Sequence, residues 1–213
     1  MKAYVFDLDG TLLDSMRLWE QIDLEFLNKR GLEVPADYID AICSRSFPEA
    51  AAYTIERFGL SESVEDLLKE WQDMAAYAYG NTVEVKPNAR EYLHELKKRG
   101  MLLAVATSLP ASLYEPTLRN HDIYSLFDVI CSTAEVSHGK TRPDIFYHVA
   151  SKLGVSTSDC VMFEDIQDAI MSAKTAGMTV YAVYDEVSKS QWEETKKLAD
   201  GAILDFKDAP LPE

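Results

Sequence analysis

The chain has 213 residues, of which 47% are hydrophobic, enough to build a buried core and to exclude a disordered protein. Its 36 acidic residues outnumber 21 basic ones, and the net charge of −15 argues against nucleic acid and anionic membrane surfaces as partners. Because no apolar run is long enough to span a membrane and no apolar signal core opens the sequence, we expect a cytoplasmic protein.

The first predicted element is a short buried strand over residues 4–6, where tyrosine, valine and phenylalanine form an aromatic and β-branched run. From residue 15 to residue 81 the apolar residues recur at helical spacing, and no strand pattern interrupts them. We therefore predict an all-helical insert over residues 15–81. Its four helices begin near residues 16, 35, 48 and 61 and end near residues 31, 45, 59 and 79.

Residues 82–213 alternate between helical segments and short apolar strands. The predicted helices cover residues 87–98, 110–120, 143–153, 166–176 and 188–198, and the strands cover residues 102–106, 129–131, 160–163, 179–183 and 202–204. Strands that are apolar on both faces are typical of a parallel sheet with helices on each side. We predict an α/β, Rossmann-like core domain made of residues 1–14 and 82–213, interrupted by the helical domain.

Two carboxylates follow the first strand directly, in the segment Asp7-Leu8-Asp9-Gly10-Thr11. Strand alternation puts Asp7 and Asp9 on the same side, at the edge of a parallel sheet where ligands bind. Two adjacent carboxylates repel each other unless a cation lies between them or one is protonated. Mg²⁺ suits such oxygens and leaves room for phosphate oxygens. Taken alone, the segment also fits a solvated acidic turn.

Three further polar segments follow predicted strands on this edge: Thr107-Ser108, Lys140 and Glu164-Asp165. A hydroxyl with backbone N–H groups at a helix start makes a good site for phosphate oxygens. Alone, Thr107 also fits a helix N-cap, Lys140 a solvated loop and the acidic pair an ordinary helix start. Gathered with the first two carboxylates, however, this second acidic pair would be costly without a metal. The combination predicts a site for a metal and a phosphate group.

The order and character of these segments resemble the four motifs of the haloacid dehalogenase superfamily. Residues 7–11 resemble the first motif, Thr107 the second, Lys140 the third, and Glu164-Asp165 the fourth. The resemblance covers essentially the whole chain, and the helical insert sits where the family has a small helical cap domain. Residues 140–146 together with the fourth motif resemble the β-phosphoglucomutase-like branch.

The resemblance implies a Mg²⁺-dependent phosphatase that works through an aspartyl-phosphate. Asp7 would attack phosphorus, and Asp9 would act as general acid and then as general base. Thr107 and Lys140 would hold the oxygens of the transferring group. Since dehalogenases lack an acid at the Asp9 position, its presence favours phosphoryl transfer. The implied metal ligands are Asp7, the backbone carbonyl of Asp9, Asp165 and Glu164, the last directly or through water.

Substrate choice is expected to come from the cap and from the loop after the second motif. We predict substrate contacts from Thr11, Ser108 and Arg45. The segment 43–45 resembles part of the β-phosphoglucomutase cap, where an arginine grips a phosphate, although a surface arginine at a helix end is the alternative. Residues 109–111 lack the polar and basic groups that surround the second phosphate in the mutase. This favours a phosphatase of small metabolites, such as sugar or polyol phosphates, over a sugar phosphomutase.

A second alternative, of another class, is a non-catalytic regulatory protein that binds a phosphorylated metabolite on this fold. Cys43, Cys131 and Cys160 are widely spaced without a CxxC pair, and they indicate reduced thiols. The acidic composition without an obvious apolar seam predicts a monomer. The expected partner is a small-molecule phosphate ester, with no nucleic acid and no membrane.

Overall fold

The computed structural model describes residues 2–35, 37–43 and 47–212 and divides the chain into two units. The α/β unit comprises Met1–Met16 and Val83–Glu213, and the helical unit comprises Arg17–Thr82. Among the described residues, no helix combines the length and the apolar character needed to cross a membrane. The two units are described separately.

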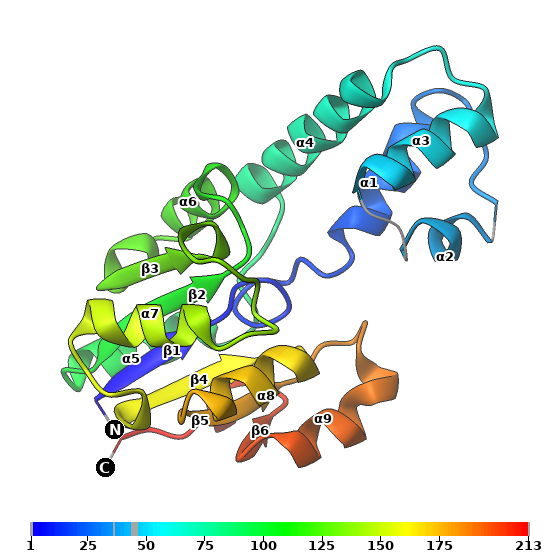
Figure 1. The fold of residues 1–213 in the computed structure, drawn as a ribbon. Helices are drawn as coiled ribbons and strands as arrows, with labels where there is room; N and C mark the ends of the chain where they lie inside the picture. The colour runs from blue at the N-terminus through cyan, green and yellow to red at the C-terminus, as the bar shows by residue number, and fades with distance from the viewer. Residues whose placement is uncertain (1, 36, 44–46, 213) are drawn as a thin grey trace. The chain divides into compact units, whose positions relative to one another are not determined.

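A parallel sheet forms the centre of the α/β unit, and within the described residues it has six strands in the order β3-β2-β1-β4-β5-β6 (Figure 1). The strands are β1 (Ala3–Phe6), β2 (Leu102–Thr107), β3 (Val129–Ser132), β4 (Cys160–Glu164), β5 (Thr179–Val183) and β6 (Gly201–Ile203). The predicted α/β class is thus confirmed. β1 pairs with β2 on one side and β4 on the other, which makes this the point where the strand order reverses.

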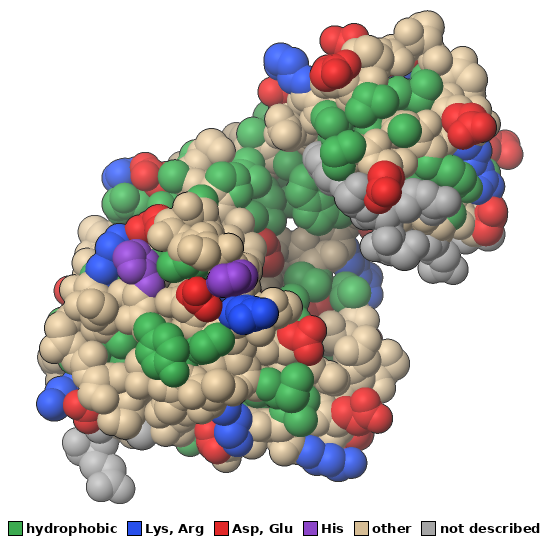
Figure 2. All heavy atoms as spheres, in the orientation of Figure 1, with side chains coloured by type: hydrophobic (Ala, Val, Ile, Leu, Met, Phe, Trp, Pro, Cys, Tyr) green, Lys and Arg blue, Asp and Glu red, His purple; other side chains and the backbone are tan. Residues whose placement is uncertain are grey.

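Helices cover both faces of this sheet, as Figure 1 shows. The helices are α5 (Ala89–Lys98), α6 (Ala111–Asn120), α7 (Asp144–Leu153), α8 (Gln167–Thr175) and α9 (Trp192–Leu198). Because side chains alternate along a strand, Ala3 and Val5 of β1 pack in one core layer with apolar residues of α7 and α8. Phe6 points to the other face, where its ring stacks on Phe163 and meets Tyr92 of α5 edge-on. On the face drawn in Figure 2, exposed acidic and basic side chains are interspersed, as is usual for solvated helices.

Four helices make up the helical unit, counted over its described residues: α1 (Leu18–Asn28), α2 (Tyr38–Cys43), α3 (Phe47–Phe58) and α4 (Val64–Asn81). Its core includes Phe26 of α1 and Trp71 of α4, whose rings meet edge-on with centroids 5.8 Å apart. Ser63 caps α4, because its hydroxyl accepts the backbone N–H of Asp66 at 3.1 Å.

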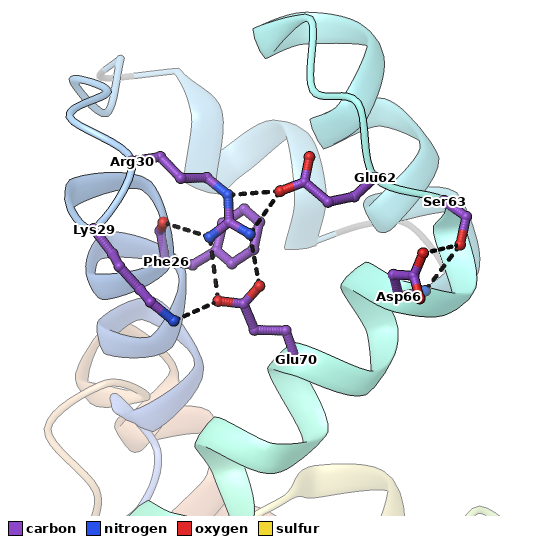
Figure 3. Close-up of polar contacts among 7 residues, drawn as sticks. All are labelled: Phe26, Lys29, Arg30, Glu62, Ser63, Asp66 and Glu70. Atoms are coloured by element: carbon purple, nitrogen blue, oxygen red, sulfur yellow. Dashed lines mark hydrogen bonds and ion pairs between the residues drawn. The ribbon is translucent and has the colours of Figure 1, made fainter.

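Arg30 ties the end of α1 to α4 through a branched ion-pair network (Figure 3). Its guanidinium donates to Glu70 at 2.6 Å and to Glu62 at 2.8 Å, and it lies over the Phe26 ring at 3.8 Å. The Arg30 side chain is only 19% exposed. Bidentate geometry and a shared partner make this network worth more than an isolated surface pair.

Several predicted bounds in the α/β unit differ from the structure by one or two residues, and the last helix differs most. The last helix begins at Trp192 rather than near residue 188, because residues 189–191 form a short 3₁₀ turn. Ser188 precedes that turn, and its backbone carbonyl accepts the N–H of Gln191, the i to i+3 hydrogen bond that is typical of a 3₁₀ turn at the start of a helix. The last strand ends at Ile203, which leaves Leu204 outside it and 66% exposed.

Candidate active site

Asp7, Lys140 and Glu164 meet at the carboxyl edge of the sheet. Asp7 follows β1, and Glu164 ends β4 at the same level, one residue beyond the paired Phe6 and Phe163. The Lys140 ammonium donates to the Asp7 carboxylate and, at 2.9 Å, to Oε2 of Glu164. Lys140 comes from the loop before α7, and its side chain is 11% exposed. These three predicted site residues are therefore brought together.

Asp165 completes the acidic cluster beside Glu164. One of its oxygens, Oδ1, accepts the Thr11 hydroxyl at 3.1 Å, while Oδ2 is buried without a hydrogen-bond partner. Oδ2 lies so close to Gly10 that a Cβ there would be 2.3 Å away, and Gly10 has a φ of +75° that favours glycine. The turn in the first motif is therefore shaped around the Asp165 carboxylate.

The buried carboxylates of this cluster repel one another, so the cluster favours the binding of an additional cation. Burial, and then the negative charge of Glu164, raise the pKa of Asp7 to about 7, although Lys140 opposes this shift. The pKa of Asp165 is raised for the same two reasons. Burial would lower the pKa of Lys140, but Asp7 and Glu164 outweigh burial and raise it. Lysine is thus held as an ammonium among carboxylates that disfavour one another's charge.

The residues of this cluster fit a divalent cation. Carboxylate oxygens of Asp7, Glu164 and Asp165 lie within 4.8 Å of one another, and all three residues are buried. One ammonium leaves three carboxylates with an excess of two negative charges, and the unpartnered Oδ2 of Asp165 is a free acceptor. Mg²⁺ is the natural occupant, because it is a hard cation that takes a few carboxylate oxygens and shares the rest of its shell with phosphate and water.

Asp9 lies beside this cluster and is held by Ser15, a residue that sequence reasoning did not select. The Ser15 hydroxyl donates to Oδ1 of Asp9 at 2.6 Å, and Ser15 is 3% exposed. The backbone N–H groups of Leu12 and Leu13 both return to the Leu8 carbonyl, so the chain curls back on itself. This curl brings Ser15 to Asp9. The one signal for this contact in the sequence is that Ser15 follows Asp9 by six residues.

Thr107 and Ser108 lie at the same edge, at the end of β2. Thr107 is buried, and its hydroxyl accepts the backbone N–H of Leu109 at 3.0 Å, whereas Ser108 is exposed. The N-cap of α6 is Pro110, so Thr107 does not cap that helix. Ser132 of β3 anchors this loop by donating to the Leu109 carbonyl at 3.0 Å.

The remaining predicted substrate contacts are placed as follows. Thr11 is fully buried and directs its hydroxyl to Asp165, so its contact with substrate stays a prediction. Arg45 lies outside the described residues. His138 is not one of the predicted contacts; it lies two residues before Lys140 in the chain, and its Nδ1 is 3.1 Å from a carboxylate oxygen of Asp144.

Comparison with known proteins gives a consistent picture. A family model described as haloacid dehalogenase-like hydrolase matches residues 4–183. A Drosophila melanogaster protein assigned as a pseudouridine-5'-phosphatase is 29% identical over 95% of this chain and 90% of its own. The phosphorylated carbohydrates phosphatase of Thermotoga maritima is 28% identical, covering 86% of this chain and 85% of its own.

A solved structure resembles the chain over nearly its full length. The crystal structure of a Thermotoga maritima protein assigned as a β-phosphoglucomutase matches with a TM-score of 0.85 and 27% sequence identity. The match covers 95% of this chain and 94% of that one. Fold and family therefore agree with the resemblance carried by the four motifs.

Proposed function

The chain belongs to the haloacid dehalogenase-like hydrolases, and from that premise we propose that it is a Mg²⁺-dependent phosphatase of small phosphorylated metabolites. The observation that carries the proposal is the convergence of Asp7, Lys140, Glu164 and Asp165 at one edge of the sheet. A nucleophile, a fixed ammonium and two further carboxylates are the groups that phosphoryl transfer through an aspartyl-phosphate requires. The reaction class follows from the site, and the family supports it.

Asp7 is the proposed nucleophile. Its carboxylate oxygen bonds to phosphorus while the bond from phosphorus to the ester oxygen breaks, which leaves an aspartyl-phosphate and an alcohol. The Lys140 ammonium opposes the upward shift of the Asp7 pKa, and in the proposed reaction it turns from the carboxylate toward the phosphate oxygens. Its second partner, Glu164, is fully buried and holds the ammonium at the site.

Asp9 is the proposed general acid and base. It gives its proton to the departing alkoxide and then takes one from the water that attacks the aspartyl-phosphate, so inorganic phosphate leaves and Asp7 is restored. The Ser15 hydroxyl donates to Oδ1 of Asp9 at 2.6 Å and so orients this carboxyl group for the proposed proton transfers. A dehalogenase needs no such acid, because halide leaves without a proton.

Asp7, Glu164 and Asp165 are the side chains proposed to hold Mg²⁺, together with the backbone carbonyl of Asp9. When bound, the ion supplies charge neutralisation between the nucleophile and the phosphate group. Thr11 orients Asp165, and the backbone N–H groups of Asp165 and Ile166 bind Oε1 of Glu164, so both carboxylates are fixed before the ion arrives.

Sugar and polyol phosphates are the proposed substrate class. The Thermotoga maritima relative named a phosphorylated carbohydrates phosphatase, matched over 86% of this chain, supports this choice. Ser108, exposed beside the buried Thr107, is the proposed hydroxyl contact for the phosphate group. We also propose that residues 15–81 act as the cap domain and that the expected cytoplasmic, monomeric state holds.

A sugar phosphomutase is the second candidate, because the solved structure assigned as a β-phosphoglucomutase is 27% identical to this chain. A mutase must bind a bisphosphorylated intermediate at both ends. In the described loop after Thr107 the next residues are Ser108, Leu109 and Pro110, and none of them is basic. This loop therefore favours hydrolysis over phosphate transfer back to the sugar.

The experiment is a phosphate-release assay on a panel of phosphorylated sugars, polyols and nucleotides, with and without Mg²⁺. We expect metal-dependent release that Asp7→Asn abolishes and that Asp73→Asn, on an exposed residue of α4, leaves intact. Conversion of β-glucose 1-phosphate to glucose 6-phosphate with little free phosphate would establish the mutase instead. If neither the wild type nor Asp7→Asn released phosphate from any ester of the panel, while both still bound inorganic phosphate, the non-catalytic alternative would be favoured.

A further inference from the structure

A second group of potential metal ligands lies in the α/β unit, away from the catalytic carboxylates. Cys131 is a buried residue of β3, Glu135 lies in the short 3₁₀ turn after β3, and His148 lies on α7. Their ligand atoms, one thiol sulfur, one carboxylate oxygen and one imidazole nitrogen, lie within 4.8 Å of one another. None of these residues belongs to the four motifs.

The three side chains differ in their exposure to solvent. Cys131 is fully buried, whereas the His148 and Glu135 side chains are 32% and 36% exposed. Figure 2 shows histidine side chains with acidic and basic neighbours on the surface around β3 and α7. The carboxylate and the imidazole are therefore accessible from solvent, and their ligand atoms lie within 4.8 Å of the buried thiol sulfur.

Glu135 is the residue of this group whose orientation is fixed by the backbone. Its Oε1 accepts the backbone N–H of Ser132 at 2.9 Å, which aims Oε2 at the other two groups. Oε2 lies 3.3 Å from Nε2 of His148 and accepts the Lys152 ammonium at 2.6 Å. The Lys152 ammonium is therefore bound to the same oxygen that would ligate a metal ion. Because the Lys152 side chain is 43% exposed, it can turn into solvent when a metal ion replaces it.

We propose that Cys131, Glu135 and His148 form a second metal site, which takes Zn²⁺ or a divalent ion of similar softness with water in the open position. Sulfur, imidazole nitrogen and carboxylate oxygen are the zinc-type ligand set, and one thiolate with one imidazole disfavours the hard Mg²⁺. Binding displaces the Lys152 ammonium and the proton of the buried thiol. The site has three protein ligands, so it is an exchangeable rather than a closed structural site.

The proposed site is connected to the phosphate-binding loop by a single residue. Ser132 lies between Cys131 and Glu135, and its hydroxyl holds the Leu109 carbonyl in the loop after Thr107. An ion that fixes Glu135 thereby stiffens the anchor of that loop. Metal binding by these three residues can be measured independently of the proposed phosphatase activity.

Co²⁺ is the spectroscopic probe for this site, added to the full chain in saturating Mg²⁺ so that the catalytic carboxylates are occupied. We expect a thiolate-to-cobalt charge-transfer absorption in the near ultraviolet, displaced by Zn²⁺. Cys131→Ser should abolish it, and Cys160→Ser, at the other described buried thiol, should retain it. His148→Gln, at a half-exposed position that tolerates substitution, should weaken Co²⁺ binding roughly tenfold or more.

Three outcomes would overturn the proposal: the absence of the charge-transfer band in wild type, its persistence in Cys131→Ser, or wild-type affinity in His148→Gln. If Cys131→Ser fails to fold, Glu135→Gln replaces it, because glutamine keeps the acceptor for the Ser132 N–H and removes only the charge. Unchanged Co²⁺ affinity in Glu135→Gln and His148→Gln together would then refute the site.

Discussion

The buried carboxyl of Asp23 is expected to make the stability of the helical unit depend on pH. Asp23 lies on α1 and is only 8% exposed, and burial raises its pKa from 3.8 to about 7. An unfolded aspartate has a pKa near 3.9, so between about pH 4 and pH 7 the folded state binds a proton that the unfolded state does not. The free energy of unfolding therefore falls as the pH rises through this window.

The size of the effect follows from the pKa difference. Each unit of pKa difference is worth about 1.4 kcal/mol, so the roughly three units set a ceiling of about 4 kcal/mol, and partial solvation reduces the expected loss to about 2 kcal/mol. Asp23→Asn removes the ionisable group with little change in shape. It should match the wild type near pH 4 and exceed its stability by about 2 kcal/mol at pH 8.

Urea unfolding at a series of pH values between 4 and 8 measures this difference. Trp192→Phe serves as the background, because the two other tryptophans, Trp19 and Trp71, both lie in the helical unit and report its unfolding by fluorescence. Glu20→Gln, at an exposed residue of the same helix, is the matched control and should not flatten the pH profile. A stability difference between Asp23→Asn and the wild type that stays constant from pH 4 to pH 8 would refute the reasoning.

Three further substitutions test the α/β unit. Lys86→Met leaves the Asp185 carboxylate, 5% exposed, without its 2.8 Å partner and should cost about 3–5 kcal/mol of unfolding free energy in urea titrations. Gly10→Ala places a Cβ 2.3 Å from Oδ2 of Asp165 and should raise the Mg²⁺ concentration for half-maximal phosphate release roughly tenfold or more. Thr11→Val removes the hydroxyl that orients Asp165 and should shift the same Mg²⁺ titration in the same direction, by roughly tenfold.

Controls separate these effects from general destabilisation. Lys2→Met breaks an exposed ion pair and should cost about 1 kcal/mol or less, so an equal loss in Lys86→Met would contradict the burial argument. Gly100→Ala shares the left-handed φ of Gly10, but no atom lies within 4 Å of its added Cβ. If Gly100→Ala shifts the Mg²⁺ titration as far as Gly10→Ala does, the contact with Asp165 is not the cause.

Most of the fold was accessible to sequence reasoning because the α/β unit obeys local rules. Short apolar strands that alternate with helical segments predicted the parallel sheet. Polar segments at the ends of these strands predicted that Asp7, Lys140 and Glu164 lie at one edge of the sheet. The predicted bounds were wrong where a 3₁₀ turn replaces the first turn of a predicted helix, as at residues 189–191. Apolar periodicity does not distinguish such a tighter i to i+3 turn from the first turn of an α-helix.

What the sequence could not supply are contacts between residues far apart in the chain. The Lys86–Asp185 pair joins a segment beside α5 to the loop after β5, and neither residue has an unusual local pattern. Ser15 meets Asp9 only because the turn after β1 curls back. The burial of Asp23 was equally hidden, since a carboxylate within an amphipathic helix is normally on the exposed side.

The central place of β1 has a consequence for biosynthesis. β1 is made before the other strands of the sheet, yet its two neighbours are β2, which begins at Leu102, and β4, which begins at Cys160. Until both have been made, the nascent chain contains an apolar strand with two unpaired edges. The helical unit, whose contacts are local in sequence, is complete long before that. The last neighbour of β1 is thus made late, and truncated or stalled chains that end before residue 160 expose this strand, which directly precedes Asp7, to aggregation.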